Sequence, residues 1–302
     1  METRQLGRTG IGVSSIGLGC VTFGREIDRT TSFAILDHAF EHGITLLDTA
    51  AVYGDGASET VLGEWLADRG VRDRVVLATK VSRSYTRDAV LESVENSLRR
   101  LRTDHIDLLQ FHTWVGDTPL DEALGALDRV VQEGKVRAVG CSNWTAEQVA
   151  QALGRAEARG WARFEAVQPP YSLVRREIEA DLLPLCADHG LGVVTYSPLG
   201  AGFLTGKYRQ DGPVPEGTRF DVIPGHQGLY FNDHCFRVME GLRQLADDTD
   251  RSMIQLALAW VLGRLGVTSV LVGARRPDHV DQAFEAERAG LPPDIRNSLD
   301  EL

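Results

Sequence analysis

The chain has 302 residues, of which 43% are hydrophobic and 25% charged, so it is long enough for one large α/β domain or two ordinary domains. The formal net charge of −11 argues against a nucleic-acid-binding protein, which would need a basic face to neutralise phosphates. Four scattered cysteines, a polar N-terminus and the lack of a long apolar run argue against a disulfide framework, a metal site, a signal peptide and a membrane span, and predict a cytoplasmic protein.

A β-hairpin is expected first, with residues 4–6 paired to 11–13 across a turn at 8–10. Apolar runs of strand length then alternate with amphipathic stretches of helix length. The expected strands lie at 15–18, 44–47, 75–78, 106–111, 136–139, 164–167, 191–195 and 267–272. The expected helices lie at 32–41, after the N-caps Ser58 and Thr86, from 120 to a stop at Gly134, after a Thr145–Gln148 capping box, and at 177–188, 233–247, 252–265 and 278–289.

Two segments depart from this alternation. Pro184 lies inside the helix expected at 177–188 and should kink or interrupt it. Residues 200–231 form a Gly/Pro-rich segment that is too long for a bare connection in a compact domain, so we interpret it as a functional flap over a site.

Eight strand-like runs, each followed by a helix or a loop leading to one, predict a single (β/α)₈ TIM barrel over residues 1–302. No shift in composition divides the chain into two parts. A doubly wound sheet is the rival architecture. It would require a GxGxxG turn after the first strand, and the stretch GLGCVTFG at that place has the wrong spacing.

Polar and aromatic residues follow most of the expected strands. Taken singly, each has an ordinary explanation as a solvated loop residue or a turn. Barrel closure brings the carboxyl ends of all the strands to one mouth, however, and the concurrence of these residues predicts an active site there. They are Asp48 with Tyr53 on the same loop, Lys80, His112, Ser142 and Asn143, Gln168, Tyr196 to Pro198, and Gly273 to Arg276.

These residue types suit proton donation to a carbonyl oxygen. A phenol such as Tyr53 has an unperturbed pKa near 10, and a neighbouring ammonium is expected to lower it. Lys80 supplies that ammonium, and Asp48 keeps it charged and positioned. His112 is then placed to orient the carbonyl by a hydrogen bond. Because no metal-ligand cluster or activated nucleophile is visible, a nicotinamide cofactor is the expected hydride source.

The chain resembles the aldo-keto reductase family over essentially its whole length. The residues that carry the resemblance are GLGCVTFG, LLDTAAVYGDGASE, LATK, DLLQFH, EGKVRAVGCSN, VQPPYS, TYSPLGAGFLTGKY and VLVGARRPDHV. The resemblance implies a TIM barrel sealed at its base by the N-terminal hairpin, with NADP(H) lying across the strand mouths. It also implies that Tyr53 is the general acid/base, that Asp48 and Lys80 tune it, and that His112 orients the carbonyl.

The same resemblance implies a set of cofactor contacts. The carboxamide would meet Ser142, Asn143 and Gln168, Tyr196 would stack on the nicotinamide, and the loop from Ser197 to Lys207 would fold over the pyrophosphate. The full expected set is Gly19, Cys20, Thr22, Asp48, Ser142, Asn143, Gln168, Tyr196, Ser197, Pro198, Leu199, Gly200, Lys207, Gly273, Arg275, His279 and Gln282. His279 and Gln282–Ala283 depart from the family pattern and weaken the adenine contact, whereas Arg275 and Arg276 favour NADP over NAD.

The substrate site is expected to be open and shallow, because the segment after Lys80 and the C-terminal tail are both short for the family. Its candidate walls are Phe23, Val52, Tyr53, His112, Trp114, Trp144 and Phe203, of which the aromatic residues have ordinary packing as an equal alternative.

The resulting hypothesis is an NADP(H)-dependent oxidoreductase that reduces an aldehyde or ketone, with no nucleic-acid or membrane partner. Two alternatives remain open. One is reduction of a keto-sugar or sugar nucleotide in a biosynthetic pathway. The other, from a different class of protein, is a cofactor-binding regulatory subunit that resembles the potassium-channel β subunits. The sequence predicts neither the oligomeric state nor the physiological substrate.

Overall fold

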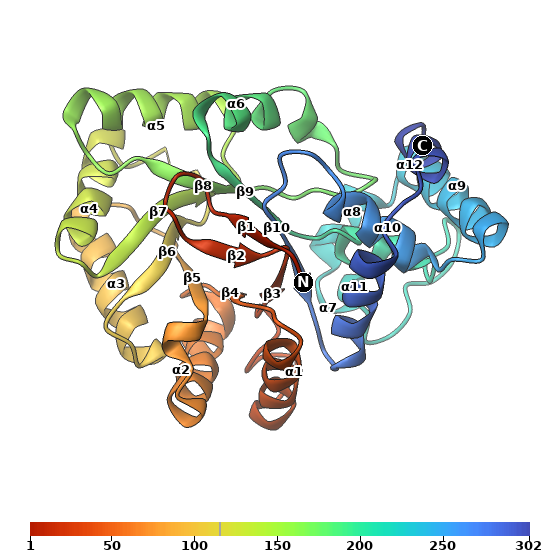
Figure 1. Ribbon diagram of the computed structural model, residues 1–302, viewed down its shortest axis with the longest axis horizontal. Coiled ribbons are helices and arrows are strands. Elements are labelled where there is room, and N and C mark those ends of the chain that lie inside the picture. The colour runs from red at the N-terminus through yellow and green to blue at the C-terminus, as the bar shows by residue number, and fades with distance from the viewer. Residues whose placement is uncertain (115) are drawn as a thin grey trace.

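Eight parallel strands close into a barrel in the computed structural model, which describes residues 1–114 and 116–302 (Figure 1). The barrel strands are β3 (Ile16–Gly19), β4 (Leu46–Asp48), β5 (Val76–Val81), β6 (Ile106–Phe111), β7 (Val136–Ser142), β8 (Phe164–Gln168), β9 (Gly192–Thr195) and β10 (Ser269–Gly273). They follow one another in chain order around the barrel, and β10 pairs with β3 to close it. The predicted (β/α)₈ architecture is confirmed.

A two-stranded antiparallel hairpin, β1 (Thr3–Gln5) with β2 (Gly12–Ser14), lies across one end of the barrel (Figure 1). Its apolar side chains Leu6, Ile11 and Val13 are buried in one cluster with side chains of the barrel interior. At the turn, Gly7 has a φ of 56°, and a Cβ there would clash with the backbone of Glu165. The hairpin therefore seals the base of the barrel, as the family resemblance implied.

Helices cover the outside of the barrel. The α-helices are α1 (Arg29–Glu41), α2 (Ala57–Arg69), α3 (Arg87–Leu101), α4 (Leu120–Gln132), α5 (Ala146–Arg159), α6 (Leu182–His189), α7 (Arg219–Val222), α8 (Gln227–Tyr230), α9 (Asp233–Thr249), α10 (Met253–Leu262), α11 (Asp278–Ala289) and α12 (Pro293–Asp300). Short 3₁₀ turns are η1 (Tyr53–Gly56), η2 (Arg72–Arg74), η3 (Glu177–Glu179), η4 (Gly200–Thr205) and η5 (Pro224–His226).

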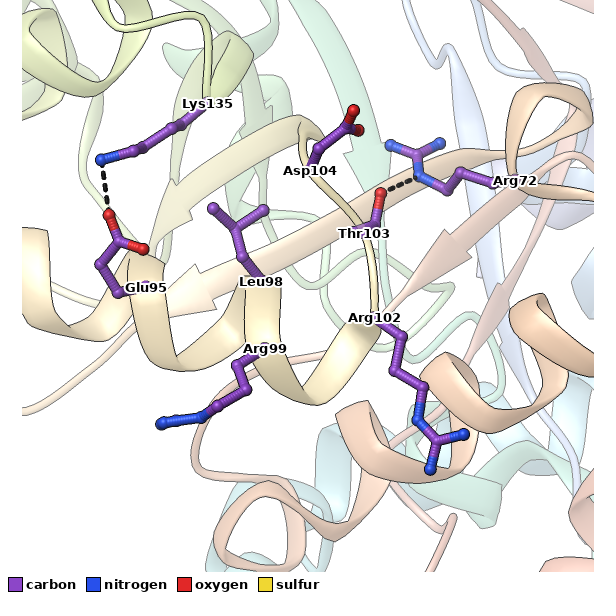
Figure 2. Close-up of a pocket in the computed structure, with 8 residues that line it drawn as sticks. All are labelled: Arg72, Glu95, Leu98, Arg99, Arg102, Thr103, Asp104 and Lys135. Carbon is purple, nitrogen blue, oxygen red and sulfur yellow. Dashed lines mark hydrogen bonds and ion pairs between the residues drawn. The ribbon is translucent and has the colours of Figure 1, made fainter.

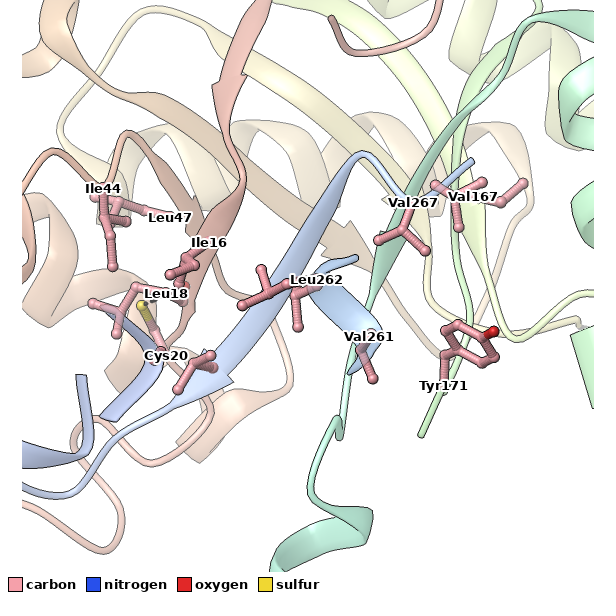
Figure 3. Packing of buried hydrophobic residues seen from close by; sticks show 14 of the residues in the cluster. Ile16, Leu18, Cys20, Ile44, Leu47, Val167, Tyr171, Val261, Leu262 and Val267 are labelled. Atoms are coloured by element: carbon pink, nitrogen blue, oxygen red, sulfur yellow. Dashed lines mark hydrogen bonds between the residues drawn. The ribbon is translucent and has the colours of Figure 1, made fainter. Parts of the chain in front are cut away.

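Alternate residues of each strand face two different cores. In β4, β5 and β6 the residues Leu46, Val76 and Leu108 point into the barrel, whereas their successors pack outward under the helices. Figure 3 shows part of this outer layer, in which Ile16 and Leu18 of β3 lie with apolar residues of β4 and of α10. Because successive side chains of a strand alternate between these two layers, the layer of one residue determines the direction of every later residue in that strand.

Three local predictions differ from the structure wholly or in part. Ser58 is not the N-cap of α2; Gly56 takes that place with a φ of 93°, and the buried Ser58 hydroxyl instead donates to the Cys20 carbonyl. The helix expected at 177–188 is split into η3 and α6, with Pro184 in the first turn of α6, where no intrahelical N–H is required. Thr86 is the N-cap of α3, but its side chain makes no capping hydrogen bond.

The flap of residues 200–231 is more ordered than a bare loop, because it contains η4, α7, η5 and α8. An aromatic cluster holds it together. Phe203, Tyr208, Phe220 and Tyr230 are each at most 4% exposed and have ring centroids 4.9–6.2 Å from their neighbours in the cluster. Across residues 1–114 and 116–302, no helix combines the length and the apolar character that a membrane crossing requires.

Candidate active site

The inward-facing positions of the strands converge at the carboxyl mouth of the barrel. Counting in steps of two from Leu46, Val76 and Leu108 reaches Asp48, Lys80 and then Gln110 and His112. The same count brings Ser142, Gln168, Tyr196 and Gly273 to this mouth. The strand period therefore explains why residues from seven separate strands share one site.

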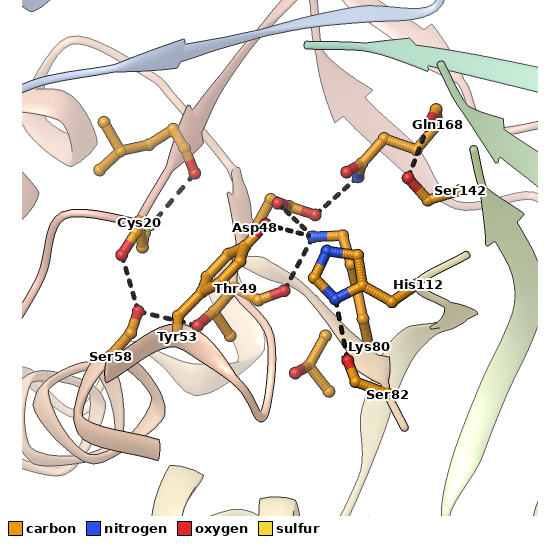
Figure 4. Close-up of polar contacts among 12 residues, drawn as sticks. Cys20, Asp48, Thr49, Tyr53, Ser58, Lys80, Ser82, His112, Ser142 and Gln168 are labelled. Atoms are coloured by element: carbon orange, nitrogen blue, oxygen red, sulfur yellow. Dashed lines mark hydrogen bonds and ion pairs between the residues drawn. The ribbon is translucent and has the colours of Figure 1, made fainter. Parts of the chain in front are cut away.

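A buried ion pair lies at the centre of this site (Figure 4). The Lys80 Nζ is 2.6 Å from the Asp48 Oδ2, and the two side chains are 1% and 4% exposed. Lys80 also donates to the Thr49 carbonyl at 2.9 Å, while Gln168 donates from its Nε2 to the other Asp48 oxygen at 2.7 Å. Burial lowers the pKa of Lys80, but Asp48 and Tyr53 raise it by more, so the ammonium stays charged.

Tyr53 lies on η1, directly above the ion pair. Gly54 and Asp55 adopt left-handed backbone angles there, and this tight turn places the phenol oxygen 3.5 Å from the Lys80 Nζ. Burial raises the pKa of Tyr53, Lys80 pulls it down, and Asp48 raises it again, so that the net shift is upward. Lys80 thus lowers the pKa of this phenol as expected, but desolvation outweighs the ammonium.

His112 faces Tyr53 edge to face, with ring centroids 5.6 Å apart. Its pKa is lowered to about 4 by burial and by the Lys80 charge, which keeps the imidazole neutral at physiological pH. The Nδ1 atom lies 2.9 Å from the Ser82 hydroxyl. When that hydroxyl donates to Nδ1, the proton of the neutral ring is on Nε2, and Nε2 becomes a hydrogen-bond donor.

The residues expected to hold a carboxamide form one hydrogen-bond network with the ion pair. Ser142 donates to the Gln168 carbonyl at 2.7 Å, and Asn143 donates from its Nδ2 to the His112 carbonyl at 2.9 Å. The Tyr196 hydroxyl donates to the Asn143 Oδ1 at 2.7 Å. Asn143 has a φ of 60°, an uncommon conformation that turns its amide toward this network.

Three cationic side chains gather where the flap meets the strand mouths. Burial lowers the pKa of Lys207, and the neighbouring Arg275 lowers it further. The pKa of Arg219, on α7, is also lowered, by burial and by the charges of Arg25 and Arg275. Glu26 is the ion-pair partner of Arg219 at 3.4 Å. Arg275 donates to the Gly217 carbonyl of the flap at 2.9 Å. The mutual repulsion of these cations makes the position suited to an anion.

Further contacts link predicted cofactor residues on the loops around the same mouth. Thr22 donates to the Ala274 carbonyl at 3.1 Å, which joins the loops after β3 and β10. His279 accepts a bond from the Arg275 backbone N–H at 3.3 Å. Gly200, Ala201 and Gly202 all have positive φ, so this part of the flap bends in a way that glycine permits. The remaining predicted contacts are Gly19, Cys20, Ser197, Pro198, Leu199 and Gln282.

The candidate substrate walls fall into two groups. Phe23, Trp144 and Phe203 are at most 6% exposed. Trp144 is stacked on Phe111, and Phe203 belongs to the aromatic cluster of the flap, so both contribute to packing. Val52 and Trp114 are half-buried and therefore reachable from solvent. A role in substrate binding stays a prediction for all of them.

Three residues of the site were not singled out by the sequence. Ser82 and Gln110 face inward by the same two-residue count and could have been found by it. Within the part of the chain that the structure describes, neither amide atom of the fully buried Gln110 has a hydrogen-bond partner. Arg219 had no sequence signal, because only the folded flap brings it to the mouth.

A second hollow, of about 780 Å³, lies at the opposite end of the barrel (Figure 2). It is lined by residues that precede β5 and β6, including Arg72 and Asp104. Its charges are already satisfied: Lys135 pairs with Glu95 at 2.5 Å, and Arg72 donates to Thr103 at 2.8 Å. The four residues Asp48, Tyr53, Lys80 and His112, called the tetrad below, lie at the other mouth and are therefore the better candidate for catalysis.

Comparison with known proteins agrees with this geometry. Residues 15–302 match the family model described as "Aldo/keto reductase family". A "Probable voltage-gated potassium channel subunit beta" of Arabidopsis thaliana is 32% identical over 95% of this chain and 91% of its own length. The "Uncharacterized oxidoreductase YrpG" of Bacillus subtilis is 34% identical over 100% of this chain and 96% of its own length. "Aldo-keto reductase YhdN" of the same organism is 34% identical over 94% and 88%.

Proposed function

Because the chain belongs to the aldo/keto reductase family of oxidoreductases, we propose that it reduces an aldehyde or a ketone to an alcohol with NADP(H). The observation that carries the proposal is the position of the Lys80 ammonium, which bonds Asp48 at 2.6 Å and lies 3.5 Å from the Tyr53 oxygen. A half-buried phenol beside a fixed ammonium is suited to give a proton to a carbonyl oxygen and to hold the resulting negative charge.

Each member of the tetrad has a distinct role in this proposal. Tyr53 donates its proton to the carbonyl oxygen, and Lys80 stabilises the phenolate that forms. Asp48 keeps Lys80 charged and fixes its position against the phenol. His112, neutral and with its Nδ1 engaged by Ser82, donates from Nε2 to the same carbonyl oxygen and thereby orients the substrate.

The charges and amides of the mouth fit a phosphate-rich nicotinamide cofactor. The family generally uses NAD(P)H, which supplies the hydride when bound. Lys207 is exposed and Arg219 and Arg275 are half-buried, and among the described residues these cations have few acidic partners, so they suit its phosphates. Ser142, Asn143 and Gln168 present the donors and acceptors that a carboxamide requires, and Tyr196 presents an aromatic ring beside them.

The direct test is consumption of NADPH against a panel of aldehydes, ketones and keto-sugars, repeated with NADH. We expect turnover with at least one carbonyl class and a higher kcat/KM for NADPH. Absence of turnover with every carbonyl, despite saturable NADPH binding, would contradict the proposal. A keto-sugar that outperforms all simple aldehydes would identify the substrate class.

The variant Arg275→Gln tests the preference for NADPH over NADH. A charge-assisted bond to phosphate is worth about 1.5–3 kcal/mol, so we expect the KM for NADPH to rise about 10- to 100-fold, with little change for NADH. The sequence favoured Arg276 as a second phosphate ligand, but Arg276 is exposed and its guanidinium is held by Asp278, so Arg276→Gln is the matched control. Equal effects of Arg275→Gln on the two cofactors would argue that Arg275 does not meet a 2′-phosphate.

Ser82→Ala tests the tautomer of His112. Without the hydroxyl at Nδ1, the neutral ring is free to carry its proton on either nitrogen, and fewer molecules present Nε2–H to the substrate. We expect kcat to fall about tenfold with an unchanged Kd for NADPH, in the range of a lost neutral hydrogen bond. Ser82→Thr keeps the hydroxyl and should restore kcat. If the alanine variant kept full kcat, Ser82 would have no part in orienting His112.

A regulatory role is the second candidate, favoured by the similarity to the protein named as a potassium channel β subunit. A regulatory subunit that retains its cofactor would show slow release and few turnovers. Steady multiple turnover, with a release rate for the oxidised cofactor no slower than kcat, would exclude that role as the main one.

A further inference from the structure

Two histidines and an aspartate meet on the outer surface of the barrel, away from the tetrad. His38 and His42 are four residues apart at the C-terminal end of α1, so they lie on one face of that helix. Asp281 approaches them from α11, the helix beside α1 (Figure 1). One ligand atom from each of the three residues lies within 4.8 Å of the other two.

The contacts of His42 leave one of its nitrogens available. Its Nδ1 is 2.8 Å from the His38 backbone oxygen, to which an Nδ1–H donates. The lone pair of the neutral ring is then on Nε2, the form that a metal binds. The ring is also stacked on Phe284 of α11, with centroids 5.1 Å apart, which restricts its orientation.

His38 and Asp281 are hydrogen-bonded to each other. The His38 Nε2 lies 2.6 Å from the Asp281 Oδ1, so in the metal-free protein an N–H donates to the carboxylate. Imidazole nitrogen and carboxylate oxygen are both ligands of late first-row divalent ions, and coordination would replace this proton. A bond length of about 2.0 Å places tetrahedral ligand atoms about 3.3 Å apart, which modest side-chain rotation within the cluster achieves.

We propose that His38, His42 and Asp281 form a Zn²⁺ site that ties α1 to α11. Histidines at i and i+4 on one helix chelate zinc well, and the carboxylate from the second helix gives a third ligand and neutralises charge. Water fills the fourth position. The three residues are half-buried or exposed, so the ion enters directly from solvent. Because no ligand belongs to the tetrad, the site is structural and its occupancy is independent of the proposed carbonyl reduction.

The test is calorimetric titration of untagged, chelator-treated protein with Zn²⁺, together with its thermal unfolding midpoint. We expect one equivalent to bind and the midpoint to rise with Zn²⁺ concentration, since the ion binds the folded state. Co²⁺ in place of Zn²⁺ should give the visible absorption of a tetrahedral or five-coordinate ion. No saturable binding to the wild-type chain would overturn the proposal.

His42→Ala and Asp281→Asn locate the ion. His42 is exposed, so its truncation should leave the fold intact while the affinity for Zn²⁺ falls by more than about tenfold. The Asp281→Asn variant keeps a hydrogen-bond acceptor for His38 but removes the anionic ligand, and it should weaken binding similarly. The matched control is His105→Ala, since His105 lies beside Asp104 and Asp107 without a second histidine. Binding that survives His42→Ala, or is lost in His105→Ala, would place the ion elsewhere.

Discussion

Replacement of Tyr53 by phenylalanine should lower kcat about 10²- to 10⁴-fold while the affinity for NADPH stays unchanged. That range is the usual contribution of a positioned general acid. The substitution removes only an oxygen whose one hydrogen-bond partner within residues 1–114 and 116–302 is Lys80 at 3.5 Å, so the fold and the ion pair beneath it should persist. Single-turnover kinetics with a saturating carbonyl substrate, and equilibrium titration of NADPH, measure the two quantities separately.

The pH profile of the wild-type enzyme gives a second measurement of the same role. Reduction requires Tyr53 protonated, and burial raises its pKa above the ordinary value, so activity is lost only above the pH range in which a phenol ordinarily ionises. The required neutral form of His112 is lost as the pH falls through about 4. We therefore expect a flat kcat/KM for reduction across neutral pH. A Tyr53→Phe variant with unchanged turnover, or a wild-type rate that falls between pH 6 and 8, would contradict these assignments.

Lys80→Met should both unfold the protein more easily and abolish turnover. Removing one partner of the buried pair leaves Asp48 without its counter-ion, and such a loss costs about 3–5 kcal/mol. Urea unfolding, followed by two independent probes, measures the free energy of unfolding.

The double variant Asp48→Asn with Lys80→Met separates stability from catalysis. Removing both charges should recover most of the lost stability, because no unpaired charge remains buried, but activity should stay absent. Arg83→Met is the surface control, since its ion pair with Asp55 is largely exposed on both sides and should contribute little. If the double variant regained turnover, Lys80 would not be needed to stabilise the phenolate.

Much of the barrel could be predicted because its signals are local. The strand β6 and the helix α11 have the predicted bounds, and the capping box of Thr145 and Gln148 begins α5 as expected. Errors occurred where a contact distant in sequence decided the outcome. Ser58 was predicted as a helix cap from its neighbours, but it is buried against Cys20 and Thr49 of the barrel, so the cap is left to Gly56.

The flap, too, was predicted from the sequence only in part. Its length and composition indicated a functional segment, whereas its aromatic cluster and the approach of Arg219 to Glu26 depend on how the segment packs. The proposed Zn²⁺ site is another feature that the sequence shows only in part. His38 and His42 are visible as an i, i+4 pair in the sequence, but Asp281 lies 239 residues beyond His42 and joins them only because β10 pairs with β3.

The sequence by itself determined the alternation of strands and helices, the hairpin, and the polar residues that follow each strand, since all of these depend on short-range periodicity. It therefore identified Asp48, Tyr53, Lys80 and His112 as candidates. Only the tertiary structure decided their contacts and protonation. The pairing of β4 with β5 sets the 2.6 Å approach of Lys80 to Asp48, and burial, which no local pattern specifies, raises the pKa of Tyr53 and lowers that of His112.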